Sequence, residues 1–131
     1  KVRSIVDKLS KKNKVEAKEH SFENRPWGKF ENLIEEKHYK VKKILVLPKR
    51  RLSLQYHNFR SEHWLIVSGL AKVHLDGKEL VLGSGQSIDI PCKSNHFIEN
   101  LNEENLIIIE TQLGTYFGED DIVRLDDPYS R

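Results

Sequence analysis

Short runs of apolar residues that alternate with polar ones fill the chain between residues 28 and 113. The runs recur about every ten residues, and most end in turn-forming residues such as Asp76-Gly77, a two-residue hairpin signal. No part of this region has the 3.6-residue period of a helix. The pattern predicts nine strands, at 28–35, 38–47, 52–57, 63–68, 70–75, 78–82, 86–90, 96–101 and 105–113. Many short antiparallel strands at even spacing favour an all-β sandwich or barrel.

The two ends of the chain differ from this central region. Residues 2–12 predict a short amphipathic helix because four apolar residues fall at helical spacing, Val2, Ile5, Val6 and Leu9. Residues 10–24 are polar and without period, so they predict a linker, with a boundary near Ser21. We therefore expect a connecting helix and linker over 1–20 and one folded domain over 21–131. Near the carboxyl end, residues 120–124 predict one helical turn or a closing tail.

The composition excludes several classes of protein. Among 131 residues, 37% are hydrophobic and 32% charged, and apolar runs reach only four residues, as from Leu106 to Ile109. No segment can span a bilayer, and no signal sequence begins the chain, so we expect a cytoplasmic protein. The single cysteine, Cys92, cannot form an intrachain disulfide. The chain contains no methionine, which indicates a fragment of a longer protein.

Charge is distributed in segments, although the net charge is only +2. Residues 40–51 carry six Lys or Arg and no acidic residue, whereas residues 119–131 carry five acids against two Arg. We interpret the basic cluster as a solvated strand face, with a site for an anionic small molecule as the alternative. Nucleic acid is not an expected partner because the aromatic residues do not interleave with the basic ones.

The candidate chemistry lies between residues 52 and 64. Residues two apart on a strand share a face, so Gln55 and His57 point to the same side. Glu62 lies at the entry to the next predicted strand, and His96 begins another. An amide oxygen, two imidazoles and a carboxylate could converge on one cation, a set that suits zinc, manganese, iron or cobalt better than calcium or magnesium. The alternative is that these histidines are structural.

A second set of residues resembles the two-part motif of the cupin superfamily. Its parts are Gly69 and Gly85-x5-Pro91-x4-His96-x3-Asn100, with Gln55 in place of the first motif histidine. The resemblance implies a double-stranded β-helix or jelly-roll barrel. It also implies a metal held by Gln55, His57, Glu62 and His96, with zinc first and cobalt or manganese as alternatives.

Within that superfamily the chain resembles the carboxyl-terminal domain of type II mannose-6-phosphate isomerases. The resemblance rests on blocks in the same order: Arg25-Pro26-Trp27-Gly28, Leu52-Ser53-Leu54-Gln55, Arg60-x-Glu62-His63-Trp64, Val67-Ser68-Gly69 and Gly118-Glu119-Asp120-Asp121-Ile122-Val123-Arg124. It implies a metal-dependent interconversion of mannose 6-phosphate and fructose 6-phosphate. In that family a mannose-1-phosphate guanylyltransferase domain usually precedes, joined by a short helix that residues 1–12 fit. No phosphate-cradling glycine-rich loop occurs here, so we expect that nucleotidyltransferase domain to be missing from this chain.

Other positions carry secondary expectations. We expect Arg60 to contact substrate oxygen or phosphate, with a loop salt bridge as the alternative. A phosphate role for Lys42 is less favoured than a solvated strand lysine. The sequence does not identify the catalytic base: Glu110 and Gln112 could face the interior, but a position at the rim of the core is favoured. We expect packing roles for four further residues, His63, His74, Trp27 and Trp64. The sequence departs from the family at Lys93, where a turn glycine is usual, and at Phe97, where arginine is common.

Three functions remain open from the sequence. The first is the isomerase, with a sugar phosphate as substrate. The second is a non-catalytic cupin that binds metal or sugar and regulates or dimerises a nucleotidyltransferase. The third is an oxygen-using dioxygenase with iron or copper, against which Gln55 argues because it replaces a histidine ligand. Cupins commonly pair through sheet edges, so we also expect a homodimer, with the helix at 2–12 packed on the partner.

Overall fold

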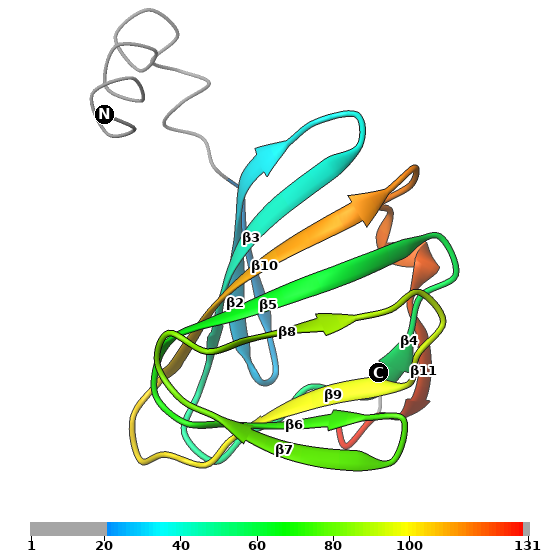
Figure 1. The fold of residues 1–131 in the computed structure, drawn as a ribbon. Helices are drawn as coiled ribbons and strands as arrows, with labels where there is room; N and C mark the ends of the chain where they lie inside the picture. Colours follow the sequence, from blue (N-terminus) through cyan, green and yellow to red (C-terminus); the bar gives the residue numbers. More distant parts are fainter. Residues whose placement is uncertain (1–20, 130–131) are drawn as a thin grey trace, which may run out of the picture.

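The computed structural model describes residues 21–129, which form eleven strands in two antiparallel sheets and one 3-10 turn (Figure 1). In order of pairing, the first sheet contains β1 (Phe22–Arg25), β2 (Gly28–Glu35), β3 (Tyr39–Val46), β10 (Leu106–Gly114), β5 (Arg60–Ser68) and β8 (Ser87–Ile90). The second contains β11 (Val123–Asp126), β4 (Leu54–Tyr56), β9 (His96–Asn100), β6 (Ala71–Leu75) and β7 (Lys78–Leu82). The predicted connecting helix lies outside the described residues. Within residues 21–129, no helix is long and apolar enough to cross a bilayer.

From β3 onward the chain passes back and forth between the two sheets. β3, β5, β8 and β10 belong to the first sheet, whereas β4, the β6–β7 hairpin, β9 and β11 belong to the second. Figure 1 shows the two sheets facing each other with these crossings at both ends. This winding is that of a double-stranded β-helix, the jelly-roll barrel expected from the sequence.

The nine predicted strands are confirmed, and two further strands were not predicted. β1 pairs with β2 from Arg25↔Gly28 to Phe22↔Glu31, so residues 22–24 form a strand and their assignment to the linker was wrong. β11 follows a 3-10 turn (η1, Glu119–Asp121) and pairs with β4. The carboxyl segment therefore contains both the predicted helical turn and an edge strand. β1 has a single apolar residue, Phe22, and β11 is only four residues long, so neither was recognised as a strand from the sequence.

The interior between the sheets has two different ends. Four alternate residues on each of β3, β5 and β10 point inward and are buried. At one end these inward residues are apolar and form what we call the apolar floor: Ile44, Val46, Trp64, Ile66, Leu106 and Ile108. At the other end of the same strands they are polar and form what we call the polar mouth: Lys40, Lys42, Arg60, Glu62, Glu110 and Gln112. Each large floor side chain contributes about 1.5–3 kcal/mol by burial, which helps offset the cost of burying charge in the mouth.

Candidate metal centre

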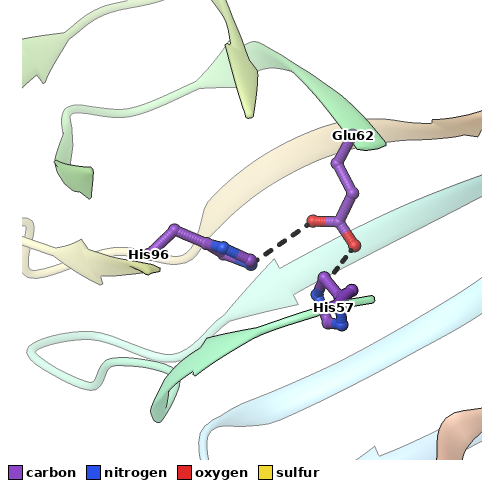
Figure 2. A group of neighbouring side chains, drawn as sticks. All are labelled: His57, Glu62 and His96. Atoms are coloured by element: carbon purple, nitrogen blue, oxygen red, sulfur yellow. Dashed lines mark ion pairs between the residues drawn. The ribbon is translucent and has the colours of Figure 1, made fainter. Parts of the chain in front are cut away.

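Three side chains that could hold a metal ion meet in the polar mouth. His57 follows β4, Glu62 lies on β5, and His96 begins β9. In Figure 2 the Glu62 carboxylate points between the two imidazole rings. His57 Nε2 lies 3.2 Å from Glu62 Oε2, and His96 Nε2 lies 3.7 Å from Glu62 Oε1. The three ligand atoms all lie within 4.8 Å of one another, close enough to share one ion.

Backbone carbonyls orient both histidine rings. The Nδ1 of His57 lies 2.9 Å from the carbonyl oxygen of Asp121, and the Nδ1 of His96 lies 2.9 Å from that of Ser94. A carbonyl oxygen only accepts hydrogen bonds, so each Nδ1 carries the hydrogen and donates it. In the neutral ring, Nε2 then has a free lone pair directed at the centre. This arrangement is typical of histidines that bind metals.

Gln55 lies beside the same centre. It pairs with His96 across β4 and β9, and its side chain is buried and lines the same pocket as Glu62. Its Nε2 donates to the carbonyl and hydroxyl oxygens of Ser53, at 3.2 and 3.0 Å. The amide oxygen is therefore the atom available as a ligand. The structure thus places all four predicted ligands in the interior, three of them in mutual contact and Gln55 as their strand neighbour.

The charges at this centre favour a cation. Burial opposes ionisation of Glu62, but the hydrogen bond from His57 and the charges of His57, His96 and Arg60 hold its pKa well below the usual range. For His57, burial is outweighed by the hydrogen bond and charge of Glu62, so its pKa is raised. For His96, burial dominates and lowers the pKa. Because the pKa of His57 is raised, a proton and a divalent cation would compete for its Nε2 beside the carboxylate.

Arg60 is an inward residue of β5 and only 4% exposed. Its Nε donates to Glu62 Oε2 at 3.1 Å, whereas its buried Nη1 has no hydrogen-bond partner among the described residues. The expected alternatives were a substrate contact and a loop salt bridge. The structure contains a buried ion pair on a strand, together with a spare donor in the interior.

Glu110 and Gln112 are fully inside the barrel, so their predicted place at the core rim was wrong. The indole Nε1 of Trp64 donates to Glu62 Oε1 at 3.2 Å and to Glu110 Oε1 at 3.1 Å. Gln112 Nε2 donates to the other oxygen of Glu110 at 2.5 Å. Burial, and then the nearby charge of Glu62, raise the pKa of Glu110. Trp64 therefore joins a ligand-capable carboxylate to a second, more easily protonated one, which goes beyond the packing role expected for it.

Lys40 and Lys42 are also inward residues of the polar mouth, so their predicted solvated position was wrong. Lys42 Nζ donates to Glu119 Oε2 at 3.1 Å and lies 4.0 Å from the centre of the Phe30 ring. Burial, and then the charge of Lys42, lower the pKa of Lys40. These partners come from distant parts of the sequence, so strand alternation alone could not identify them.

Asp121 anchors the segment that carries His57. Its two carboxylate oxygens accept the backbone N–H groups of Asn58 and Phe59, each at 2.9 Å. Its own carbonyl is the acceptor for His57 Nδ1. The only sign of this anchoring role in the sequence is that Asp121 belongs to the block from Gly118 to Arg124 that resembles the isomerase family.

Residues with no assigned role at the centre have other partners. His63 pairs with Asp89 at 2.6 Å, and His74 stacks on Phe97 with ring centres 3.9 Å apart.

Lys93 has φ 67°, the left-handed conformation that glycine adopts most easily, at the turn where the family resemblance expects glycine.

Two curated proteins illustrate what this chain is similar to in sequence. The chain is 44% identical over 126 residues to a putative mannose-1-phosphate guanylyltransferase of Vibrio cholerae, covering 96% of this chain and 27% of that protein. It is 43% identical over 130 residues to the alginate biosynthesis protein AlgA of Pseudomonas aeruginosa, covering 99% of this chain and 27% of that one. The chain thus spans about a quarter of the length of these relatives.

Solved structures share the fold at low sequence identity. An RmlC-like cupin from Shewanella frigidimarina matches with a TM-score of 0.67 and 22% identity, over 79% of this chain and 89% of that one. The capsular polysaccharide assembling protein CapF of Staphylococcus aureus matches with a TM-score of 0.71 and 19% identity, over 82% of this chain and 34% of that one. The fold is therefore that of the cupins. A family model described as "Mannose-6-phosphate isomerase C-terminal" matches residues 12–127, and the chain belongs to this family.

Proposed function

We propose that this chain is a metal-dependent isomerase domain that interconverts mannose 6-phosphate and fructose 6-phosphate. The observation that carries the proposal is the buried cluster of His57, Glu62 and His96, whose ligand atoms converge beside Arg60 and Glu110. The family description and the guanylyltransferase names of the relatives support the same pathway of sugar activation. In the full-length protein the domain would follow a mannose-1-phosphate guanylyltransferase domain. We expect it to act in the cytoplasm and as a homodimer.

Zinc is the ion that we assign to the site, with cobalt or manganese as substitutes. Two imidazole nitrogens, a carboxylate and an amide oxygen form a mixed N/O set, which suits these ions better than calcium. The ligands would be Gln55, His57, Glu62 and His96. Once bound, a divalent ion would supply Lewis-acid polarisation of the sugar carbonyl without any redox change.

The protein's own groups have separate tasks in moving a proton between C1 and C2. Glu110 lines the same pocket, and its raised pKa makes it easier to protonate, which suits a group that takes and returns a proton. Arg60 can donate from its free Nη1 to a substrate oxygen that gains negative charge. Arg60, Glu62, His96 and Glu110 line one pocket, so a bound sugar could contact all four.

The test uses the whole chain, stripped with a chelator and reloaded with zinc, cobalt or manganese. Fructose 6-phosphate formation from mannose 6-phosphate is followed in a coupled assay, together with metal content. We expect activity only with metal. His57→Ala should lose both metal and activity, whereas His63→Ala, which changes an outer histidine paired with Asp89, should keep both. A chain that binds metal yet shows no turnover with any of the three ions would contradict the proposal and favour the non-catalytic cupin.

A further inference from the structure

Two cations share one aromatic ring inside the pocket. The guanidinium carbon of Arg25 lies 5.0 Å from the centre of the Phe30 ring, and Lys42 Nζ lies 4.0 Å from it. Phe30 is buried, and both cations line the same pocket as Glu62 and His96. The ring thus holds two positive groups close enough to contact a single anion.

A carboxylate from the chain itself already bridges these two cations. Glu119 Oε2 lies 3.1 Å from Lys42 Nζ, and Glu119 Oε1 lies 3.6 Å from Arg25 Nη2. The Glu119 side chain is 41% exposed, whereas that of Lys42 is 6% exposed. An acidic side chain therefore reaches in from the surface to neutralise a buried ammonium group. Because η1 is held by Asp121 through the backbone of Asn58 and Phe59, the Glu119 side chain can leave without moving that turn.

A second buried ammonium group neighbours Lys42 on the inward face of β3. Lys40 is buried, and its salt bridge is a 4.0 Å contact to Glu35, whose side chain is 66% exposed. A buried ammonium group with so few acceptors favours a ligand that brings several acceptor oxygens. A phosphate monoester has more charge and more acceptor oxygens than one carboxylate.

The spacing of the strands matches the length of such a ligand. Lys42 pairs with Glu110 and Glu110 with Trp64, while Lys40 pairs with Gln112 and Gln112 with Glu62. The lysines are thus two strands away from Glu62, which is about 10 Å at the usual strand separation. An open-chain hexose 6-phosphate carries its phosphate at the far end from C1 and C2. With C1 and C2 at the metal centre, the phosphate would lie towards β3.

We propose that Lys42 and Arg25 form the subsite for the substrate phosphate, and that the Glu119 carboxylate occupies this subsite until the phosphate displaces it. The identity of the ligand as a hexose 6-phosphate rests on the proposed function. The subsite itself rests on the two cations on Phe30 and the bridging carboxylate. Phosphate binding then opens the pocket at the point where Glu119 closes it.

Calorimetric titration of the chelator-treated chain tests the subsite without turnover. The ligands are inorganic phosphate, mannose 6-phosphate and mannose. We expect Glu119→Gln to bind both phosphate-bearing ligands about threefold to tenfold more tightly, because a competing charge is lost. Lys42→Met should bind them about tenfold or more weakly, while Lys42→Arg retains most of the affinity. A comparable ion pair on the second sheet, Lys72 with Glu79 at 3.4 Å, provides the controls Lys72→Met and Glu79→Gln, which should bind like the unmodified chain.

Two results would overturn the inference. One is a Glu119→Gln variant with the same phosphate affinity as Glu79→Gln, and the other is a folded Lys42→Met variant that binds like Lys72→Met. If Lys42→Met does not fold, the Glu119→Gln comparison decides alone. The expected binding in a chain that shows no isomerisation with any metal would support the subsite and refute the proposed isomerase.

Discussion

Replacing Asp121 by asparagine tests how the metal centre is held. One carboxylate oxygen accepts the N–H of Asn58 and the other accepts that of Phe59, each at 2.9 Å. Asparagine offers one oxygen, so one N–H then faces an NH2 group and loses its partner. The remaining hydrogen bond is weaker, because its acceptor oxygen is no longer part of a charged carboxylate.

The magnitude follows from these two bonds. A hydrogen bond to a charged group contributes about 1.5–3 kcal/mol, so the loss of one and the weakening of the other should cost about 2–3 kcal/mol. The free energy of unfolding of a domain of this size is about 5–15 kcal/mol, so the variant should still fold. The backbone carbonyl that orients His57 is retained but less firmly held, and we expect metal affinity to fall about 10- to 100-fold, as for other groups that support a ligand.

Two measurements with one control decide the outcome. Urea unfolding of the chelator-treated chain gives the stability, and a competitive zinc titration gives the affinity. The control is Asp120→Asn, which changes the adjacent, exposed aspartate, whose carboxylate accepts a hydrogen bond from the Tyr116 hydroxyl. If Asp121→Asn matches Asp120→Asn in both measurements, Asp121 does not anchor the centre and the reasoning fails.

Three further variants test the interior. Arg60→Ala should bind zinc about tenfold more weakly, because Nε supports Glu62, and should lose still more turnover; unchanged turnover in the coupled assay would contradict its proposed substrate contact. Glu110→Gln should remove a pH dependence of the stability. The pKa of Glu110 is raised in the native state, so between the unfolded and the native pKa the native state keeps a proton that the unfolded state has lost. The free energy of unfolding of the unmodified chain therefore falls as the pH rises through this range. Urea unfolding of the metal-free chain between pH 4 and 8 checks this, and equal slopes for both proteins would disprove it. Gly28→Ala should cost more than about 1 kcal/mol, because its Cβ would lie 1.9 Å from the Leu45 carbonyl oxygen. The thermal-melting control is Gly83→Ala, where φ is not positive and the added Cβ makes only ordinary contacts of 3.6 and 3.8 Å.

The sequence predicted nine of the eleven strands and the shared face of Gln55 and His57, because both depend on local alternation. Glu62 lies inside β5 and His96 begins β9, and their convergence with the other two depends on how distant strands pair, so the sequence could offer it only as a hypothesis.

Alternation failed for the lysines of β3. The order Lys40-Val41-Lys42-Lys43-Ile44 places lysines on both faces, so composition does not distinguish the inner one from the outer one. Lys42 is tolerated inside because of Phe30 and because of Glu119, which follows it by 77 residues. Such a pair forms only when η1 returns to the mouth of the barrel, and no local pattern encodes that return.

The placement of core and site on one strand limits which changes in chain length the protein can accept. Arg60, Glu62, Trp64 and Ile66 are successive inward residues of β5, so the floor and the mouth depend on a single alternation. Deleting one residue between Glu62 and Trp64 would turn one half of this strand inside out, and either the packing or the metal centre would be lost. Insertions and deletions should therefore be confined to loops such as 101–105, while β5 should change by substitution alone.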